Sequence, residues 1–362
     1  MAVSRVSDTL EIQSHRGPYV VRFETGPVEE IVPRVLAGTA HVLVDANVAR
    51  LYSDALAPIL ARPTTILIEA TEANKSIEAT IPIFQQLVAN RIRRDHRMVA
   101  IGGGIVQDIC CFIASVLLRG VPWTFVPTTL LAQADSCIGS KSSINLGDTK
   151  NIIGTFNPPV EIFVYDRFLD TLDTKELRSG IGEILKVHAI DGPSSFDQLA
   201  GDFSELLTDR AVLRRYIRAA LEIKQRYIEI DEFDRDVRNI FNYGHSFGHA
   251  IESATHYAIP HGIAVSIGMD MANSVAAERG LVPVEHARRM HDTLHRNYAA
   301  FADAPIPLEP LFDALMKDKK NTSTMLGLIL PIGDSAAIQR VQVAPDDAFR
   351  AQCKAFLADG RR

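Results

Sequence analysis

Residues 97–108 read RMVAIGGGIVQD, an apolar strand-like run that turns through three glycines into a helix-like segment. A strand that leads directly into a helix is the unit from which parallel α/β sheets are built. Consecutive glycines at such a turn let backbone N–H groups approach a pyrophosphate, whose charge the following helix N-terminus favours. The same glycines also suit a plain tight turn. The segment therefore predicts a parallel sheet and makes the turn a candidate phosphate site.

The chain before and after this segment repeats the same alternation. The expected strands are 41–45, 64–68, 97–101 and 123–126, and the expected helices are 29–37, 48–60 and 76–89. Two more short strands are expected within residues 9–23, around the turn Arg16-Gly17-Pro18. Asp45 ends one strand, where its carboxylate could accept a hydrogen bond from a ribose hydroxyl or cap the next helix. The alternation is typical of a parallel sheet with crossover helices.

From about residue 175 onward, helical spacing dominates the sequence. Residues 205–230 show it throughout, and the exception is a late pair of strand-like runs near 325–330 and 338–341. We therefore expect two domains. The first is an α/β domain with a parallel sheet over residues 1–173, and the second is a mainly α-helical domain over residues 174–362.

The overall composition excludes several classes of protein. At 362 residues the chain is long enough for two cores, and its net charge of −6 gives no general attraction to nucleic acid. No apolar run is long enough to span a bilayer, and the first residues lack the apolar core of a signal peptide. Four cysteines without a CxxC pair predict reduced thiols. We expect a cytoplasmic protein that binds neither nucleic acid nor a membrane.

Residues 238–261, RNIFNYGHSFGHAIESATHYAIPH, contain four histidines among small and apolar residues. His245 and His249 are four positions apart, so a helix would place both rings on one face, one turn apart. Neutral imidazole is a common zinc ligand, and a further histidine follows at His261. The alternative is a packed helix whose histidines are satisfied by hydrogen bonds. A ligand from elsewhere in the chain would decide between these two interpretations.

Glu183 is our candidate for that ligand. It lies in the apolar helical segment GIGEILK (180–186), where a carboxylate needs a partner. Lys186 lies three positions on, on the same helix face, so a simple salt bridge is equally compatible with the pattern. Ser179, just before this segment, is expected to be the helix N-cap.

Residues 127–151 combine hydroxyl side chains and glycines in what we interpret as a loop. Lys141, Lys150 and Asn151 would make this loop a good anion site. The alternative for either lysine is that it is simply solvated. Surface charge is likewise the alternative for Lys224, which lies in a helical segment rich in charged residues.

These segments together resemble the dehydroquinate synthase family of sugar-phosphate cyclases. The resemblance covers nearly the whole chain, in order, through EANK (72–75), GGGIVQD (102–108), RG (119–120), PTTLLAQADSCIGSK (127–141), KNIIGTFNPP (150–159), GIGEILK (180–186), NYGHSFGHAIE (242–252) and HGIAV (261–265). So many motifs in order and spacing are far more specific than any one of them. The resemblance implies an N-terminal NAD-binding domain, a helical metal-binding domain, an active site between them and a homodimer.

The resemblance also implies the metal site. Glu183, His245 and His261 match the ligands of a divalent ion, Zn²⁺ or Co²⁺. His249, which helical spacing alone makes a candidate ligand, would instead contact the hydroxyl or phosphate groups of the substrate.

Further positions match residues that hold the cofactor and the substrate in this family. The positions that would hold NAD are Asp45, Glu72, Lys75, Gly103, Gly104, Asp108, Thr128, Thr129, Lys150 and Thr171. The catalytic positions, besides His249, would be Asp135, Lys141, Lys186, Lys224, Arg238 and Asn242. The remaining substrate-binding positions would be Arg119, Asn151, Lys319 and Lys320. Arg119 would reach the phosphate of the substrate in the neighbouring subunit.

The activity that the resemblance implies is conversion of 3-deoxy-arabino-heptulosonate 7-phosphate into 3-dehydroquinate and phosphate. A hydroxyl is oxidised transiently by NAD, phosphate is eliminated, the ketone is reduced again, and an aldol step closes the ring. Lys224 and Arg238 match a clamp for the substrate carboxylate. Such a cationic pair is costly to desolvate without an anion between its members, so the pair favours a carboxylated substrate.

Three positions depart from the family pattern and leave other substrates open. They are Gln107, Ser140 and Asp148. The alternative activities are another cyclase that uses sedoheptulose 7-phosphate or glucose 6-phosphate, and a metal-dependent polyol dehydrogenase of the glycerol dehydrogenase type. A binding protein that senses NAD without catalysis is a further alternative of a different class.

Overall fold

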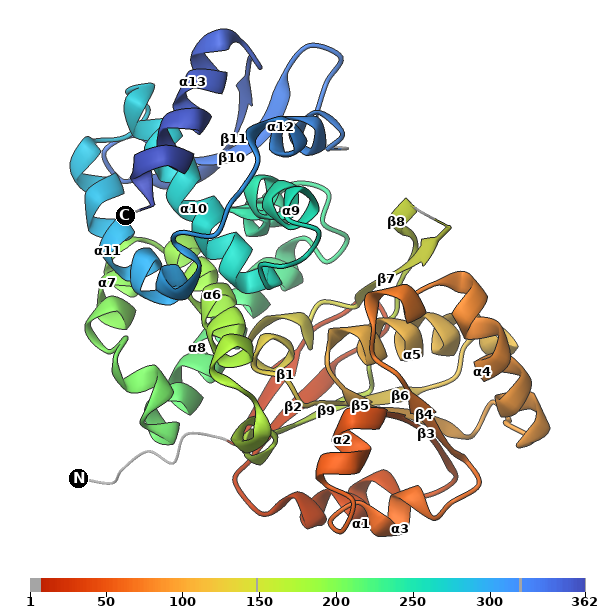
Figure 1. The fold of residues 1–362 in the computed structure, drawn as a ribbon. Helices are drawn as coiled ribbons and strands as arrows, with labels where there is room; N and C mark the ends of the chain where they lie inside the picture. The colour runs from red at the N-terminus through yellow and green to blue at the C-terminus, as the bar shows by residue number, and fades with distance from the viewer. Residues whose placement is uncertain (1–7, 148, 319–320, 362) are drawn as a thin grey trace, which may run out of the picture. The chain divides into compact units, whose positions relative to one another are not determined.

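The computed structural model describes residues 8–147, 149–318 and 321–361, and the chain forms two compact units (Figure 1). The first unit comprises the residues up to 172 together with 225–233, and the second comprises 173–224 together with the residues from 234 onward. A mainly parallel sheet with helices forms the first unit, and the second is mainly helical. The fold class predicted from the sequence is therefore confirmed.

The sheet of the first unit has seven strands in the order β1-β2-β9-β6-β5-β3-β4. Their bounds are β1 (Thr9–Ile12), β2 (Tyr19–Glu24), β3 (Ala40–Asp45), β4 (Thr65–Ile68), β5 (Arg97–Gly102), β6 (Trp123–Pro127) and β9 (Glu161–Tyr165). All neighbouring strands are parallel except β1 and β2, which form an antiparallel hairpin. Val99 of β5 pairs with Val42 of β3 and with Thr124 of β6. This register brings the carboxyl ends of β3, β5 and β6 to one edge of the sheet.

Helices cover both faces of this sheet in Figure 1, with α4 and α5 on one side and α1, α2 and α3 on the other. Their bounds are α1 (Ile31–Val35), α2 (Ala46–Leu51), α3 (Ala57–Leu60), α4 (Ile77–Ala89) and α5 (Gly104–Val116). Val42 and Val99 of the strands share one buried core with Ile31, Val48 and Ile59 of the helices. Burying such side chains stabilises the unit by about 1.5–3 kcal/mol for each residue.

The single helix predicted over residues 48–60 is wrong. The structure has two short helices there, because α2 ends at Leu51 and α3 begins at Ala57. Pro58 lies in the first turn of α3, where its missing N–H group costs nothing and its fixed φ suits the start of a helix. The proline therefore starts a new helix instead of continuing the old one.

The loop predicted over residues 127–151 is also wrong. A π-helical turn, η4 (Ala132–Ser136), is followed by an antiparallel ribbon of β7 (Lys141–Leu146) and β8 (Thr149–Phe156). The hydroxyls that suggest a loop pair across the ribbon, where Ser142 Oγ lies 3.0 Å from Thr155 Oγ1. The two strands can approach each other closely at Gly154, because a Cβ atom there would collide with the Ser142 carbonyl oxygen.

The second unit is built around α10, whose side chains are buried along most of its length. Its elements are α6 (Thr174–Asp191), α7 (Pro193–Gly201), α8 (Arg210–Ile230, whose last residues belong to the first unit), α9 (His245–Ala254), α10 (His261–Glu278), α11 (Val284–Tyr298), α12 (Leu308–Met316), β10 (Leu326–Ile332), β11 (Ala337–Val343) and α13 (Asp347–Ala355). The helices α6, α9 and α11 all pack against α10. The late strand pair is confirmed as the antiparallel hairpin of β10 and β11.

Three further sequence expectations concern the cap of α6, the cysteines and membrane-spanning helices. The N-cap of α6 is Asp173, whose carboxylate accepts from the Glu176 N–H at 2.8 Å, so the prediction that Ser179 caps this helix is wrong. All four cysteines are free thiols, as predicted, and all four are buried. Within residues 8–147, 149–318 and 321–361, no helix is both long enough and apolar enough to cross a membrane.

Candidate active site

One carboxylate and three imidazoles from three different helices meet in the second unit. Glu183 comes from α6, His245 and His249 from α9, and His261 from the first turn of α10. The Oε1 atom of Glu183 lies 3.3 Å from Nε2 of His261 and 3.8 Å from Nε2 of His245. The ligand atoms of the three histidines lie within 4.8 Å of one another.

Hydrogen bonds fix the orientation of two of these rings. Nδ1 of His245 lies 3.3 Å from the carbonyl oxygen of Tyr243, and Nδ1 of His261 lies 3.0 Å from Oε2 of Glu252. Each Nδ1 is thereby occupied, and each Nε2 faces Glu183. Such a hydrogen bond on the second ring nitrogen is the usual support of a histidine that binds a metal.

The charges in this cluster suit a cation between Glu183 and the rings. Burial, together with the nearby Lys186, His249 and His261, lowers the pKa of His245 well below its ordinary value, so this ring is neutral and able to bind a metal. Burial also disfavours the charged form of His261, but Glu183 and Glu252 outweigh it and raise its pKa to about 10. Without an ion His261 therefore keeps its proton near neutral pH, and a divalent ion such as Zn²⁺ or Co²⁺ would displace that proton when it binds Nε2.

Lys186 forms a second contact with the same carboxylate. Its Nζ lies 2.5 Å from Oε2 of Glu183, and both side chains are almost completely buried. The salt bridge and the approach of the histidines, which the sequence left as alternatives, are both present because they use different oxygens of Glu183. Breaking a buried pair of this kind leaves an uncompensated charge and costs several kcal/mol.

Three other predicted residues of the second unit lie on α8 and on η7 (Val237–Asn242). Lys224 and Arg238 are each only 6% exposed, so both cations are held in the interior and not on the surface. Asn242 donates to the carbonyl oxygen of Asn239 at 3.0 Å. Two long cationic side chains are seldom buried unless they serve an anion or another partner. Lys319 and Lys320 lie outside the described residues.

In the first unit, several predicted cofactor-binding residues lie at the carboxyl ends of β3, β5 and β6. Asp45 ends β3 and caps α2, since its carboxylate accepts from the Asn47 N–H at 2.8 Å. Gly103 lies against Thr129, where a Cβ atom would come within 2.9 Å of the threonine methyl group. Thr128 follows β6 and donates its N–H to Gly102. Ligands of parallel α/β sheets bind at this edge.

A second group of predicted residues forms a polar network between η2 (Glu72–Asn74), α5 and the ribbon. Lys75 Nζ lies 3.3 Å from Asp108 Oδ2 and 2.8 Å from Asn151 Oδ1. Lys150 lies 3.6 Å from Oε1 of Glu72. Burial raises the pKa of Asp108 to about 6, with the positive charge of Lys75 opposing the shift. The structure thus brings together five residues that lie up to 79 positions apart.

The other predicted positions of the first unit are more scattered. Asp135 is buried in η4, and Lys141 is exposed at the start of β7. Thr171 Oγ1 lies 3.1 Å from the Tyr52 hydroxyl. Arg119 is exposed at the end of η3 (Leu117–Arg119), with a left-handed φ of 66°.

The structure describes two of the residues that depart from the family pattern and explains one of them. Gln107 is buried and makes two hydrogen bonds with Ser136, donating to its carbonyl oxygen at 2.6 Å and accepting from its hydroxyl at 2.7 Å. This pair ties α5 to the turn that carries Asp135. Ser140 has a φ of 57°, the left-handed region in which a glycine is more comfortable. The third departure, Asp148, lies outside the described residues.

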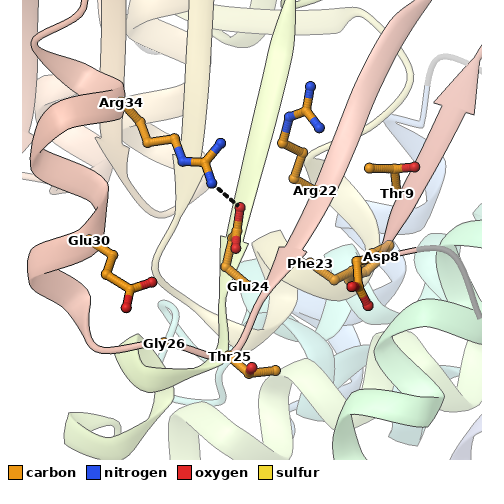
Figure 2. Close-up of a pocket in the computed structure, with 9 residues that line it drawn as sticks. All are labelled: Asp8, Thr9, Arg22, Phe23, Glu24, Thr25, Gly26, Glu30 and Arg34. Carbon is orange, nitrogen blue, oxygen red and sulfur yellow. Dashed lines mark ion pairs between the residues drawn. The ribbon is translucent and has the colours of Figure 1, made fainter. Parts of the chain in front are cut away.

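A separate hollow of about 410 Å³ lies beside the end of β2 (Figure 2). It is lined by three carboxylates and two guanidinium groups, namely Asp8, Glu24, Glu30, Arg22 and Arg34. Figure 2 shows Arg34 paired with Glu24, at 3.1 Å, and Arg22 is paired with Glu161 of β9. The hollow therefore lacks the excess positive charge that a sugar phosphate requires.

Sequence reasoning did not identify Glu252, which orients His261. A signal for it exists, because Glu252 follows His249 by three positions and His245 by seven on the same helix, and therefore lies on the same face. No comparable signal exists for the Gln107–Ser136 pair, whose members are 29 positions apart.

Comparison with known proteins identifies the family. Residues 65–179 match the model for the N-terminal part of 3-dehydroquinate synthase, and residues 180–321 match the model for its C-terminal part. The chain belongs to the 3-dehydroquinate synthase family. A 3-dehydroquinate synthase of Thermoanaerobacter sp. (strain X514) is 31% identical over 333 residues, which cover 90% of this chain and 94% of the relative. Another, from Rhizobium leguminosarum bv. trifolii (strain WSM2304), is 35% identical over 316 residues, or 84% of each chain.

Solved structures extend the comparison within sugar-phosphate cyclases. The 2-epi-5-epi-valiolone synthase from Streptomyces hygroscopicus subsp. jinggangensis 5008, with NAD⁺ and Zn²⁺ bound, is 26% identical with a TM-score of 0.82 over 99% of both chains. A 2-deoxy-scyllo-inosose synthase complexed with carbaglucose-6-phosphate, NAD⁺ and Co²⁺ has a TM-score of 0.80 at 22% identity, over 96% of this chain and 99% of that one. At 22% identity, the likeness to the 2-deoxy-scyllo-inosose synthase shows that the two chains share a fold.

Proposed function

We propose that this protein converts 3-deoxy-arabino-heptulosonate 7-phosphate into 3-dehydroquinate and phosphate, with NAD as a recycled cofactor and Zn²⁺ or Co²⁺ as its metal. The observation that carries the proposal is the meeting of Glu183, His245 and His261 beside the buried Lys186. Such a site suits a polyol oxidation that precedes elimination, because a metal ion acidifies the hydroxyl whose carbon loses a hydride. The NAD⁺ and metal ions bound to the two related cyclases support both cofactors.

Residues of both units supply the binding groups in this proposal. Glu183, His245 and His261 would hold the ion, and we assign the network of Glu72, Lys75, Asp108, Lys150 and Asn151 to NAD and the substrate, as the resemblance implies. When bound, NAD accepts a hydride and later returns it, and the ion acidifies the hydroxyls that it coordinates. The turn at Gly103 and Gly104, at the N-terminus of α5, offers backbone N–H groups to the pyrophosphate.

Buried cations of the second unit fit the anionic parts of this substrate. Lys224 and Arg238 are both held in the interior, and we assign the substrate carboxylate to them, because charge-assisted hydrogen bonds are little screened by water there. Lys186 and Asn242 provide donors for substrate hydroxyls or phosphate. His249 is exposed, with its ring centroid 5.2 Å from that of His245, and we assign it to contact with the substrate.

The choice among cyclase substrates rests on the comparisons and on the cation pair. Relatives named 3-dehydroquinate synthase share 31–35% of their residues with this chain, whereas the two cyclases of other names share 22–26%. A carboxylated substrate offers the two buried cations an anion that they can bind by charge-assisted hydrogen bonds. Sedoheptulose 7-phosphate and glucose 6-phosphate have no carboxylate to fill that role.

A panel of sugar phosphates tests the proposed activity. The purified protein, with NAD and zinc, is given the heptulosonate phosphate, sedoheptulose 7-phosphate, glucose 6-phosphate or glycerol, and phosphate and NADH are measured. We expect phosphate release with the first substrate and no accumulation of NADH. A strong preference for sedoheptulose 7-phosphate would overturn the carboxylate clamp, and steady NADH formation from glycerol would overturn the cyclase itself.

We further propose that the protein acts as a homodimer in which Arg119 contributes to the neighbouring active site. Leu118, Arg119 and Gly120 have three consecutive left-handed φ values, of 53°, 66° and 121°, in a turn that presents Arg119 outward. Mixing Arg119→Ala subunits with Lys186→Met subunits tests this arrangement. Mixed dimers should regain activity that neither variant has alone, and a mixture that stays inactive although the subunits exchange would exclude the arrangement.

A further inference from the structure

Each side chain of the histidine–carboxylate cluster has a glycine as its neighbour in the sequence. Gly182 precedes Glu183, Gly244 precedes His245, Gly248 precedes His249, and Gly262 follows His261. The pattern recurs on α6, α9 and α10, which indicates that the glycines allow these three helices to pack closely together.

The first contact joins α6 to α10 through their backbones. A Cβ atom on Gly182 would collide with the carbonyl oxygen of Gly262, and one on Gly262 would collide with the carbonyl oxygen of Ser179. The Gly262 N–H also donates to the Ser179 hydroxyl at 3.0 Å. No residue larger than glycine fits at either position without moving the two helices apart, and this separation sets how far Glu183 lies from His261.

The second contact joins α9 to α10 in the same way. A Cβ atom on Gly268 would collide with the carbonyl oxygen of Gly244, and one on Gly244 would lie 2.7 Å from the carbonyl oxygen of Val265. At Gly248 the approach is less tight, since a Cβ atom would lie 3.2 Å from the carbonyl oxygen of Ala264. This second separation sets how far His245 and His249 lie from His261.

The distances of α6 and α9 from α10 matter because a metal ion binds tightly only when its ligand atoms lie close to fixed distances from it. With bonds of about 2.0–2.2 Å, tetrahedral ligand atoms lie about 3.3–3.6 Å apart. The Glu183–His261 and His245–Glu183 separations of 3.3 and 3.8 Å are close to that range without any ion. Metal sites require their distances within about 0.2 Å, which is much less than the shift that an added methyl group would force on the helices.

We propose that Gly182, Gly248, Gly262 and Gly268 are positioning residues of the metal site, and that they set its affinity by fixing the distances of α6 and α9 from α10. The inference rests on the proposed function, since it assumes that the cluster binds a divalent ion. It adds residues that touch neither metal nor substrate and that act only through the backbone.

Zinc affinity of glycine variants tests this proposal. The dissociation constant is measured by competition with a chromophoric chelator for Gly248→Ala and Gly182→Ala, and the visible spectrum of the Co²⁺-loaded protein reports the coordination geometry. We expect Gly248→Ala to weaken zinc binding about 10-fold and Gly182→Ala about 100-fold or more, by analogy with residues that support metal ligands. Both should change the Co²⁺ spectrum.

Two control variants separate this effect from general destabilisation. Gly201→Ala adds a methyl group at the end of α7, where nothing lies within 4 Å, and should leave zinc affinity within twofold of wild type. Leu206→Ala removes a buried side chain of the same unit, outside α6, α9 and α10, and should lower the unfolding midpoint without changing zinc affinity.

The outcomes distinguish this proposal from the proposed function. If the wild-type protein binds neither zinc nor cobalt, the proposed function fails. If the wild type binds zinc and the folded glycine variants bind it equally tightly with an unchanged Co²⁺ spectrum, only the positioning role is overturned. If Gly182→Ala does not fold, Gly248→Ala decides, because its milder contact allows the helices to adjust by a few tenths of an ångström.

Discussion

His261 is held between two carboxylates: Nδ1 lies 3.0 Å from Oε2 of Glu252, and Nε2 lies 3.3 Å from Oε1 of Glu183. Glu252 therefore orients the ring, and Nε2 of His261 faces both Glu183 and the proposed ion. We expect Glu252→Ala to weaken zinc binding by about 10–100-fold, as measured by chelator competition. Glu252→Gln, whose amide oxygen can still accept from Nδ1, should lose less. Equal zinc affinity for Glu252→Ala and wild type would show that Glu252 has no such role.

Substitutions of His261 and of His249 should have different effects on zinc binding. His261→Ala should abolish zinc binding, because it removes a proposed ligand, whereas His249→Ala should keep most of it and lose activity instead. Zinc content after dialysis, measured by atomic emission, compares the two variants. Retention of zinc by His261→Ala together with its loss from His249→Ala would exchange their assigned roles.

The buried pair of Lys186 and Glu183 predicts a change in stability that depends on the metal. Lys186→Met leaves the Glu183 carboxylate without its ammonium partner, and should lower the free energy of unfolding of the metal-free protein by about 3 kcal/mol. Saturating zinc should reduce this difference, because the ion neutralises the same carboxylate. Urea unfolding of both proteins, with zinc and with a chelator, gives the comparison. An equal loss under both conditions would argue against an ion beside Glu183.

Ser140 predicts a substitution that stabilises the protein. Its φ of 57° is strained for a residue with a Cβ atom, and the strain costs about 1–2 kcal/mol. Ser140→Gly should raise the free energy of unfolding by about 1 kcal/mol, since part of that relief is offset by the greater freedom of glycine in the unfolded chain. Thermal unfolding of the two proteins measures the change, and a lower midpoint for Ser140→Gly would contradict the prediction.

His188 predicts loss of stability in mild acid. Burial lowers its pKa to about 4, against an opposing effect of Asp191, and Nδ1 lies 2.8 Å from the Ser195 hydroxyl. Above pH 6.5 the ring is neutral in both states and contributes nothing to the pH dependence. Between pH 6.5 and 4 only the unfolded chain takes up the proton, so stability falls, by up to about 3 kcal/mol.

Urea unfolding of His188→Asn across this pH range tests that prediction. The variant keeps a side-chain nitrogen near the position of Nδ1 but cannot titrate, so its stability should fall less between pH 6.5 and 4. His256→Asn, at an exposed position, should keep the wild-type pH dependence. If His188→Asn and wild type lose stability in parallel, His188 is not responsible for the loss.

The fold was largely predictable because its elements depend on local patterns. Strands such as Arg97–Gly102 are apolar runs followed by glycine, and α10 is a long segment of small and apolar residues. The ribbon of β7 and β8 was not predictable, because its serines and asparagines are typical of loops and pair only across the ribbon. Ser179 illustrates the same limit: its hydroxyl accepts from Gly262, 83 positions away, and not from its own helix.

The candidate site was predictable in its residue types but not in its assembly. Helical spacing alone identified His245 and His249, and the apolar surroundings of Glu183 indicated that this carboxylate needed a partner. The approach of Glu183 to His261 depends on backbone contact between α6 and α10 at Gly182 and Gly262. Such contact leaves no periodic signal, because a glycine in a helix sequence does not reveal which backbone it faces.

The most direct test of the metal site is the anomalous diffraction of crystals grown with zinc, recorded on both sides of the zinc absorption edge. We predict one strong peak about 2.0–2.2 Å from a carboxylate oxygen of Glu183 and from Nε2 of both His245 and His261. A peak coordinated by His249 in place of Glu183, or no peak within the cluster, would contradict the account.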